Sequence, residues 1–129
     1  MLERYAFWLS EQKAEGDVMG ESRGKEDLEL KKEYRRIWLD GTIQKPDSSL
    51  FQTKLTSKEI KIKPKTSNIP GLQIADLLAY PLKEKLLHER SIRKNFVGTF
   101  SEKIYSAVEK KIRRSSFGRT AGYGEIFLV

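Results

Sequence analysis

The chain contains no cysteine and a single histidine, His88, among its 129 residues. Without cysteine the protein can form no disulfide, no thiolate metal site and no cysteine nucleophile, which fits a reducing compartment. One histidine leaves little from which to build a histidine-rich zinc site or a Ser-His-Asp triad. Any metal ion that the protein binds would therefore have to be held mainly by oxygen atoms.

The sequence also lacks a long apolar run. No stretch approaches the length of a membrane span, and the first residues lack the basic start, apolar centre and small-residue cleavage site of a signal peptide. We therefore expect a soluble, cytoplasmic protein. With 129 residues, of which 38% are hydrophobic, the chain is long enough for one compact core, so we expect a single domain over residues 1–129.

The formal net charge of +7 is unevenly distributed along the chain. Residues 1–40 carry eight basic and ten acidic side chains, whereas residues 83–114 carry ten basic and four acidic ones. Such a basic surface attracts nucleic acid through salt-dependent phosphate contacts, although basic helices are also ordinary solvated surfaces. The candidate nucleic-acid-binding residues lie on and directly after the last predicted helix: Lys103, Lys110, Lys111, Arg113 and Arg114.

Hydrophobic spacing predicts helices and a few short strands. Apolar side chains recur every three to four residues, as is typical of amphipathic helices, in three stretches: 2–14, 25–39 and 99–112. Thr99 and Glu102 have the spacing of a capping box at the start of the last of these. Alternation and flanking turns predict three short strands: 17–21, 59–63 and 125–129. We therefore expect an α/β fold with four to five helices and a small sheet of two to three short strands.

A further predicted helix begins at Pro70 and has apolar side chains on nearly all sides, which is typical of a buried helix. Three polar residues, Gln73, Asp76 and Tyr80, fall on one narrow stripe of it. A buried, unpaired carboxylate is so costly that Asp76 should be hydrogen-bonded, paired with Lys or Arg, protonated or bound to a cation. A structural salt bridge and a functional role both satisfy this requirement. Pro81 predicts a kink or a restart of the helix.

The order of these elements, with Glu21 at a strand end and Asp76 on a later helix, is similar to that of a ribonuclease-H-like fold, whose acidic site collects carboxylates from separate elements. Residues 71–80, Gly-Leu-Gln-Ile-Ala-Asp-Leu-Leu-Ala-Tyr, resemble the Gly-Leu-Gln-x-Ala-Asp helix of the domain-of-unknown-function family numbered 3800, which is grouped with ribonuclease-H-like proteins. Residues 20–23 and 122–127 resemble the middle acidic strand end and the closing tail of that family.

The resemblance implies a metal-dependent, nuclease-like hydrolase of phosphodiesters. Glu21 and Asp76 would be its catalytic residues and the ligands of Mg²⁺ or Mn²⁺, with Gln73 orienting them. Members of the family open with a strand that carries Asp-Glu-Ser, and nothing in this chain corresponds to that half. The chain therefore looks like the C-terminal portion of a ribonuclease-H-like domain. We expect its two-metal site to be incomplete and the chain to be inactive alone.

Two other functions compete with the hydrolase. The first is a non-catalytic interaction module, because a partial α/β domain exposes sheet edges that pair with another copy or with a partner protein. This hypothesis predicts a homodimer, or a complex with a partner that supplies the missing strands. The second is a small basic nucleic-acid binder in which Asp76 is only salt-bridged. Its affinity would fall steeply with salt and would not depend on Mg²⁺.

Overall fold

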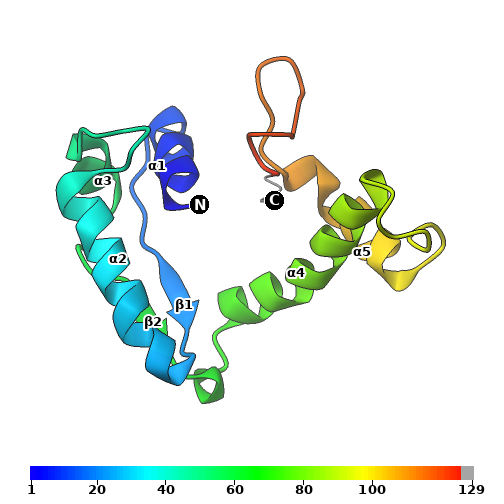
Figure 1. Ribbon diagram of the computed structural model, residues 1–129, viewed down its shortest axis with the longest axis horizontal. Coiled ribbons are helices and arrows are strands. Elements are labelled where there is room, and N and C mark those ends of the chain that lie inside the picture. Colours follow the sequence, from blue (N-terminus) through cyan, green and yellow to red (C-terminus); the bar gives the residue numbers. More distant parts are fainter. Residues whose placement is uncertain (126–129) are drawn as a thin grey trace. The chain divides into compact units, whose positions relative to one another are not determined.

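The computed structural model describes residues 1–125 and divides into an N-terminal unit, residues 1–72, and a C-terminal unit, residues 73–129. Each unit is described by itself. The helices and strands, in chain order, are α1 (Leu2–Glu11), β1 (Met19–Glu21), α2 (Asp27–Asp40), α3 (Ser49–Lys54), β2 (Lys61–Lys63), α4 (Pro70–Glu89) and α5 (Phe100–Val108) (Figure 1). Short 3-10 turns also occur: η1 (Gly24–Glu26), η2 (Lys65–Ser67) and η3 (Glu109–Lys111). The predicted α/β class is confirmed, with five helices and a two-stranded sheet in the described residues. The prediction of a single domain stays a prediction.

The core of the N-terminal unit lies between α1, α2 and α3. Its buried members come from all three helices and from the segments beside them: Ala6, Leu9, Tyr34, Phe51, Leu55 and Ile60. The Tyr34 hydroxyl donates a hydrogen bond of 2.9 Å to the carbonyl of Ser57, so burial leaves this polar group satisfied. The apolar stripes predicted for the first two helices are thus the faces that pack together.

The sheet of the N-terminal unit is small and parallel. Met19 pairs with Lys61 and Glu21 with Lys63. Parallel strands need a long connection, and here the chain between them contains α2 and α3 (Figure 1). Ile60 is buried and Ile62 half-buried, whereas Lys61 and Lys63 are exposed, which confirms the alternation predicted for this strand.

Helix α2 ends at a residue that only glycine suits. Gly41 has φ +79°, and a Cβ atom there would lie 2.4 Å from the carbonyl oxygen of Lys45. The sharp change of direction after Asp40 therefore depends on the missing side chain. The helix predicted over residues 25–39 thus ends within one residue of its predicted end.

The C-terminal unit consists mainly of α4 and α5. Thr99 caps α5, since its Oγ1 accepts a hydrogen bond of 3.3 Å from the backbone N–H of Glu102. The Thr99 half of the predicted capping box is thus confirmed, whereas the Glu102 carboxylate accepts a hydrogen bond of 2.6 Å from the N–H of Gly98 and not from that of Thr99. Phe96 is buried and contacts both the His88 ring, at 5.6 Å, and the Tyr105 ring, at 6.3 Å.

The prediction that α4 is buried is wrong for its first half. Ile74 and Leu77 are 57% and 54% exposed, and the buried residues of α4 are Pro81 and Glu84. In the C-terminal unit, the packing partners of α4 lie beside its second half, around Phe96 and Tyr105, so the apolar residues of its first half stay uncovered there. The helix also continues through Pro81 and does not restart.

Two other boundaries differ from the predictions. The last helix is shorter than predicted, because α5 ends at Val108 and is followed by η3. The predicted final strand, residues 125–129, lies outside the described residues except for Glu125, which forms an isolated bridge with Ala121. Within residues 1–125, every helix is too short or too polar to cross a membrane.

Candidate functional sites

Glu21 lies at the end of β1 in the N-terminal unit, where its side chain is exposed. Its neighbour across the sheet is Lys63, which is also exposed. After β1 the chain is held by Asp27, whose carboxylate accepts hydrogen bonds of 2.6 Å from the Ser22 hydroxyl and 2.7 Å from the Arg23 N–H. These hydrogen bonds lower the pKa of Asp27. The strand end is therefore well fixed, with the Glu21 carboxylate open to solvent.

Asp76 and Gln73 lie on the first half of α4, in the C-terminal unit, and both are exposed there. Exposure removes the desolvation cost that led us to expect Asp76 to be hydrogen-bonded, paired with Lys or Arg, protonated or bound to a cation. Glu21 and Asp76 belong to different units, so the metal site that they would share stays a prediction. Among residues 1–125, no three carboxylate or imidazole side chains are grouped as ligands of one metal ion.

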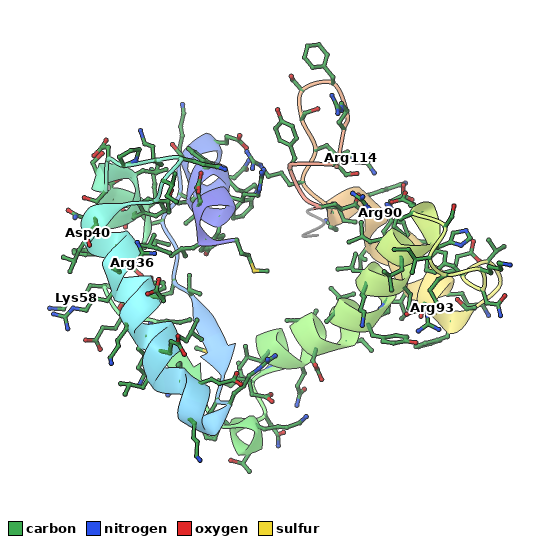
Figure 2. The ribbon with its side chains drawn as sticks, in the orientation of Figure 1. Arg36, Asp40, Lys58, Arg90, Arg93 and Arg114 are labelled. Atoms are coloured by element: carbon green, nitrogen blue, oxygen red, sulfur yellow. The ribbon has the colours of Figure 1, made fainter. Side chains whose placement is uncertain are left out.

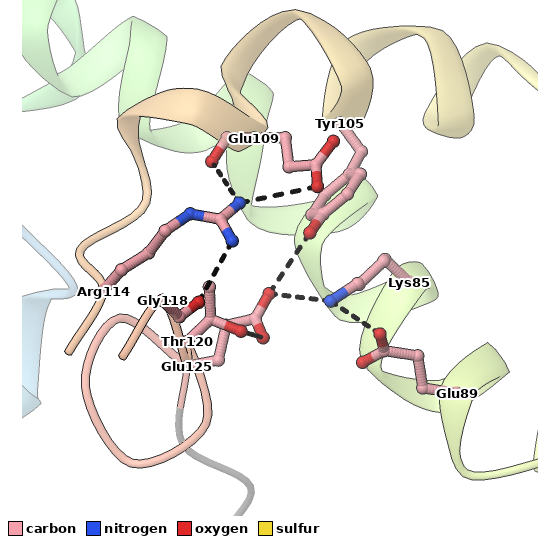
Figure 3. Close-up of polar contacts among 8 residues, drawn as sticks. All are labelled: Lys85, Glu89, Tyr105, Glu109, Arg114, Gly118, Thr120 and Glu125. Carbon is pink, nitrogen blue, oxygen red and sulfur yellow. Dashed lines mark hydrogen bonds and ion pairs between the residues drawn. The ribbon is translucent and has the colours of Figure 1, made fainter. Parts of the chain in front are cut away.

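The predicted nucleic-acid-binding residues lie on and after α5. Lys103 on α5 and Lys110 and Lys111 in η3 are exposed, as phosphate contacts require. Arg114 is exposed too, but both arginines make contacts within the unit. Arg113 lies over the Tyr123 ring at 5.6 Å. Arg114 donates a hydrogen bond of 3.3 Å to the carbonyl of Gly118 (Figures 2 and 3). The lysines are thus better placed than the arginines to bind an external polyanion.

A polar network that the sequence reasoning missed joins α4, α5 and the segment before residue 126 (Figure 3). Lys85 lies 2.9 Å from a Glu125 carboxylate oxygen and 2.8 Å from Glu89. The same Glu125 accepts a hydrogen bond of 2.7 Å from Thr120 and a longer one, 3.5 Å, from the Tyr105 hydroxyl. The side chains of Lys85 and Glu125 are only 12% and 9% exposed.

The charges of this network are stabilised by their hydrogen bonds. Burial disfavours the charged form of Lys85, but hydrogen bonds to Glu89, Glu125 and Tyr105 outweigh it and raise the pKa of Lys85. Burial likewise opposes the charge of Glu125, but the hydrogen bonds from Thr120 and Lys85 lower its pKa. Both groups are charged at neutral pH. Their arrangement fastens the chain around Glu125 to the two helices, which is a structural role.

An open pocket of about 570 Å³ lies in the C-terminal unit, between one face of α4 and the segment that leads into α5. Asp76 and Tyr80 line it, together with Glu84, which the sequence reasoning did not single out. The Glu84 carboxylate is buried and lies 3.3 Å from Arg93 Nη2. The spacing of residues 76, 80 and 84, four apart on one helix face, was the signal that could have identified Glu84.

A second open groove, of about 710 Å³, lies in the N-terminal unit. Its walls come from α1, α2 and β1, and they are mainly apolar: Met1, Tyr5, Met19, Leu30, Ile37 and Ile60. Asp17 also lines the groove and is paired with Lys61, whose hydrogen bond, with one from Thr56, lowers the pKa of Asp17.

Comparison with known proteins found no matching family model, no matching curated protein and no matching solved structure. The resemblance described from the sequence therefore stays a prediction.

Proposed function

We propose that this chain is a non-catalytic interaction module that pairs with another polypeptide through the outer edge of β1. The observation that carries the proposal is the two-stranded sheet: within the described residues, no third strand pairs with β1 or β2. An edge strand presents a row of unpaired N–H and C=O groups, which is a template for pairing with another chain.

The hydrogen bonds of the sheet identify which groups of β1 are free to pair. Lys61 N–H donates to the carbonyl of Val18 at 3.1 Å, and Ser22 N–H donates to the carbonyl of Lys63 at 2.9 Å. The backbone groups of Val18 and Ser22 therefore point toward β2. Because backbone groups alternate along a strand, those of Met19 and Glu21 point to the opposite edge. Each of these two residues offers one donor and one acceptor to a new strand.

The groove beside β1 adds an apolar surface to this edge. Met19 belongs to both, since it lies on β1 and lines the groove. Met19 and Leu30 are partly exposed and Met1 is fully exposed, so an added strand would cover apolar side chains as well as pair its backbone. We infer that the partner is an extended segment with apolar side chains on one face, from a second copy of this chain.

Sedimentation of the wild-type chain and of two variants at residue 21 tests this proposal. Glu21→Pro removes the outward-facing N–H without removing a hydrogen bond to β2, whereas Glu21→Ala keeps that N–H and removes only the side chain. We expect the wild-type and Glu21→Ala chains to self-associate and Glu21→Pro to sediment as a folded monomer. A wild-type chain that remains a stable, folded monomer at high concentration would count against the proposal.

The ribonuclease-H-like fold and metal-dependent hydrolysis by Glu21 and Asp76 remain predictions. What supports nucleic-acid binding is the exposure of Lys103, Lys110 and Lys111 on a strongly basic chain. We place the interaction module first because the free edge and the groove are both present in one unit.

A further inference from the structure

The pocket of the C-terminal unit has an unusual set of hydrogen-bonding groups. One wall is a single face of α4, on which Asp76, Tyr80 and Glu84 are spaced four residues apart. The other wall is the chain from Arg93 to Ser101, which leads into α5. A volume of about 570 Å³ is within the range of pockets that take small molecules.

Glu84 is the most constrained group in this pocket. Its side chain is only 8% exposed, and among the described residues its Oε1 atom has no hydrogen-bond partner. Arg93 Nη2 lies 3.3 Å away, at the distance of an ion pair but without the geometry of a hydrogen bond. The Arg93 side chain is 53% exposed, so it can leave the carboxylate for solvent (Figure 2). A buried carboxylate with so loose a partner has unused capacity to accept hydrogen bonds.

Pro81 leaves one backbone carbonyl of α4 without its usual donor. A proline has no N–H, so the carbonyl of Leu77, four residues earlier, loses its usual donor within the helix. Leu77, Pro81 and Asp76 all line the pocket. Acceptors on α4 are thus in excess, and Arg93 is the one cationic side chain among the described residues that line the pocket.

Aromatic rings complete the site. Tyr80 on α4 and Phe100 at the start of α5 both line the pocket, and both rings are largely exposed. An aromatic face attracts a cation that lies over it, and it also contacts the alkyl part of a ligand. Carboxylates combined with exposed rings are suited to bind an organic cation.

We propose that this pocket binds a small organic cation that carries a primary ammonium or a guanidinium group. The ligand's cationic group donates hydrogen bonds to Glu84 in place of Arg93, and its alkyl part lies between Tyr80 and Phe100. This site lies within the C-terminal unit and is independent of the function proposed for the β1 edge. The net charge of the chain, +7, repels cations, so non-specific attraction would not produce this binding.

Titration calorimetry of the full chain with agmatine and with 1,4-diaminobutane tests the proposal, and 1,4-butanediol serves as the neutral control. We expect saturable binding of at least one of the two amines and none of the diol. Glu84→Gln preserves the shape of the side chain and removes its charge, so affinity should fall at least about tenfold. Arg93→Ala removes the competing cation, so affinity should rise.

The opposite directions of these two changes distinguish a binding site from a structural ion pair. Lys94→Ala is the matched control for Arg93→Ala, because it removes the same charge from the neighbouring residue, which does not line the pocket. Circular dichroism of each variant verifies that it is folded. The proposal is overturned if neither amine binds the folded wild-type chain, if the diol binds equally well, if Glu84→Gln leaves the affinity unchanged, or if Arg93→Ala does not tighten binding beyond Lys94→Ala.

Discussion

Replacing Lys85 by Met leaves the Glu125 carboxylate buried without a cation, while Glu125→Gln leaves Lys85 with a second carboxylate, Glu89, 2.8 Å away. Removing one partner of a buried ion pair costs about 3–5 kcal/mol. Glu125 keeps its hydrogen bond from Thr120, so we expect Lys85→Met to destabilise the C-terminal unit by about 3 kcal/mol, at the low end of that range. Glu125→Gln loses one charged hydrogen bond and should cost about 1.5 kcal/mol.

Hydrogen exchange followed by mass spectrometry measures these differences in the C-terminal unit. Amides of α5 should exchange roughly tenfold faster in Glu125→Gln and more than a hundredfold faster in Lys85→Met. Both tryptophans, Trp8 and Trp38, lie in the N-terminal unit, so their fluorescence monitors that unit separately in the same samples.

The double variant, Lys85→Met with Glu125→Gln, decides whether the two side chains act as a pair. Because Lys85→Met alone leaves the Glu125 carboxylate without a cation, and the double variant no longer has that charge, the double change should cost less than the sum of the two. Additive losses of stability would refute the interpretation that Lys85 and Glu125 act as a pair. So would a Glu125→Gln variant that loses as much stability as Lys85→Met.

Three further predictions follow from individual groups. The pKa of Glu125 is lowered from 4.5 and that of Lys85 is raised from 10.5. The stabilisation that the pair adds should therefore be lost as pH falls below about 4.5 and as pH rises above about 10.5. Unfolding of the wild type and the double variant as a function of pH measures this loss. Gly41→Ala should lower the free energy of unfolding by well over about 1 kcal/mol. Gly24→Ala should lower it by less, because a Cβ atom at residue 24 would meet no atom within 4 Å. The chain alone should cleave nucleic acid with Mg²⁺ no faster than an Asp76→Asn variant does; faster cleavage by the wild type would show that it is active by itself.

Local sequence rules predicted the helices and strands of this protein better than they predicted burial and long-range contacts. The spacing of Leu2, Ala6 and Leu9 predicted α1 because a helix places these positions on one face, and that face is buried or half-buried. Thr99 and Glu102 predicted the start of α5 because a cap depends on residues three apart. Such rules need no knowledge of distant residues.

Burial and pairing could not be predicted in the same way. Ile74 and Leu77 are apolar but exposed, because the packing partners of α4 in its own unit lie beside its second half. The pair of Lys85 and Glu125 joins residues 40 positions apart, and no periodic pattern connects them. The sequence shows that an apolar residue can pack and that a charged residue can form an ion pair. Which residue it meets is determined by the tertiary fold.

A buried carboxylate does lie on α4, but two turns of helix beyond Asp76, the residue for which the sequence predicts it. Asp76 itself is exposed and can be solvated by water. Glu84 lies on the same face of α4 and is buried, so the cost of an unpaired charge applies there. The sequence did not single out Glu84, because a helical pattern shows which residues share a face and not how deep that face lies. Arg93 meets this need at 3.3 Å while remaining half exposed, and a ligand cation can therefore compete for the site.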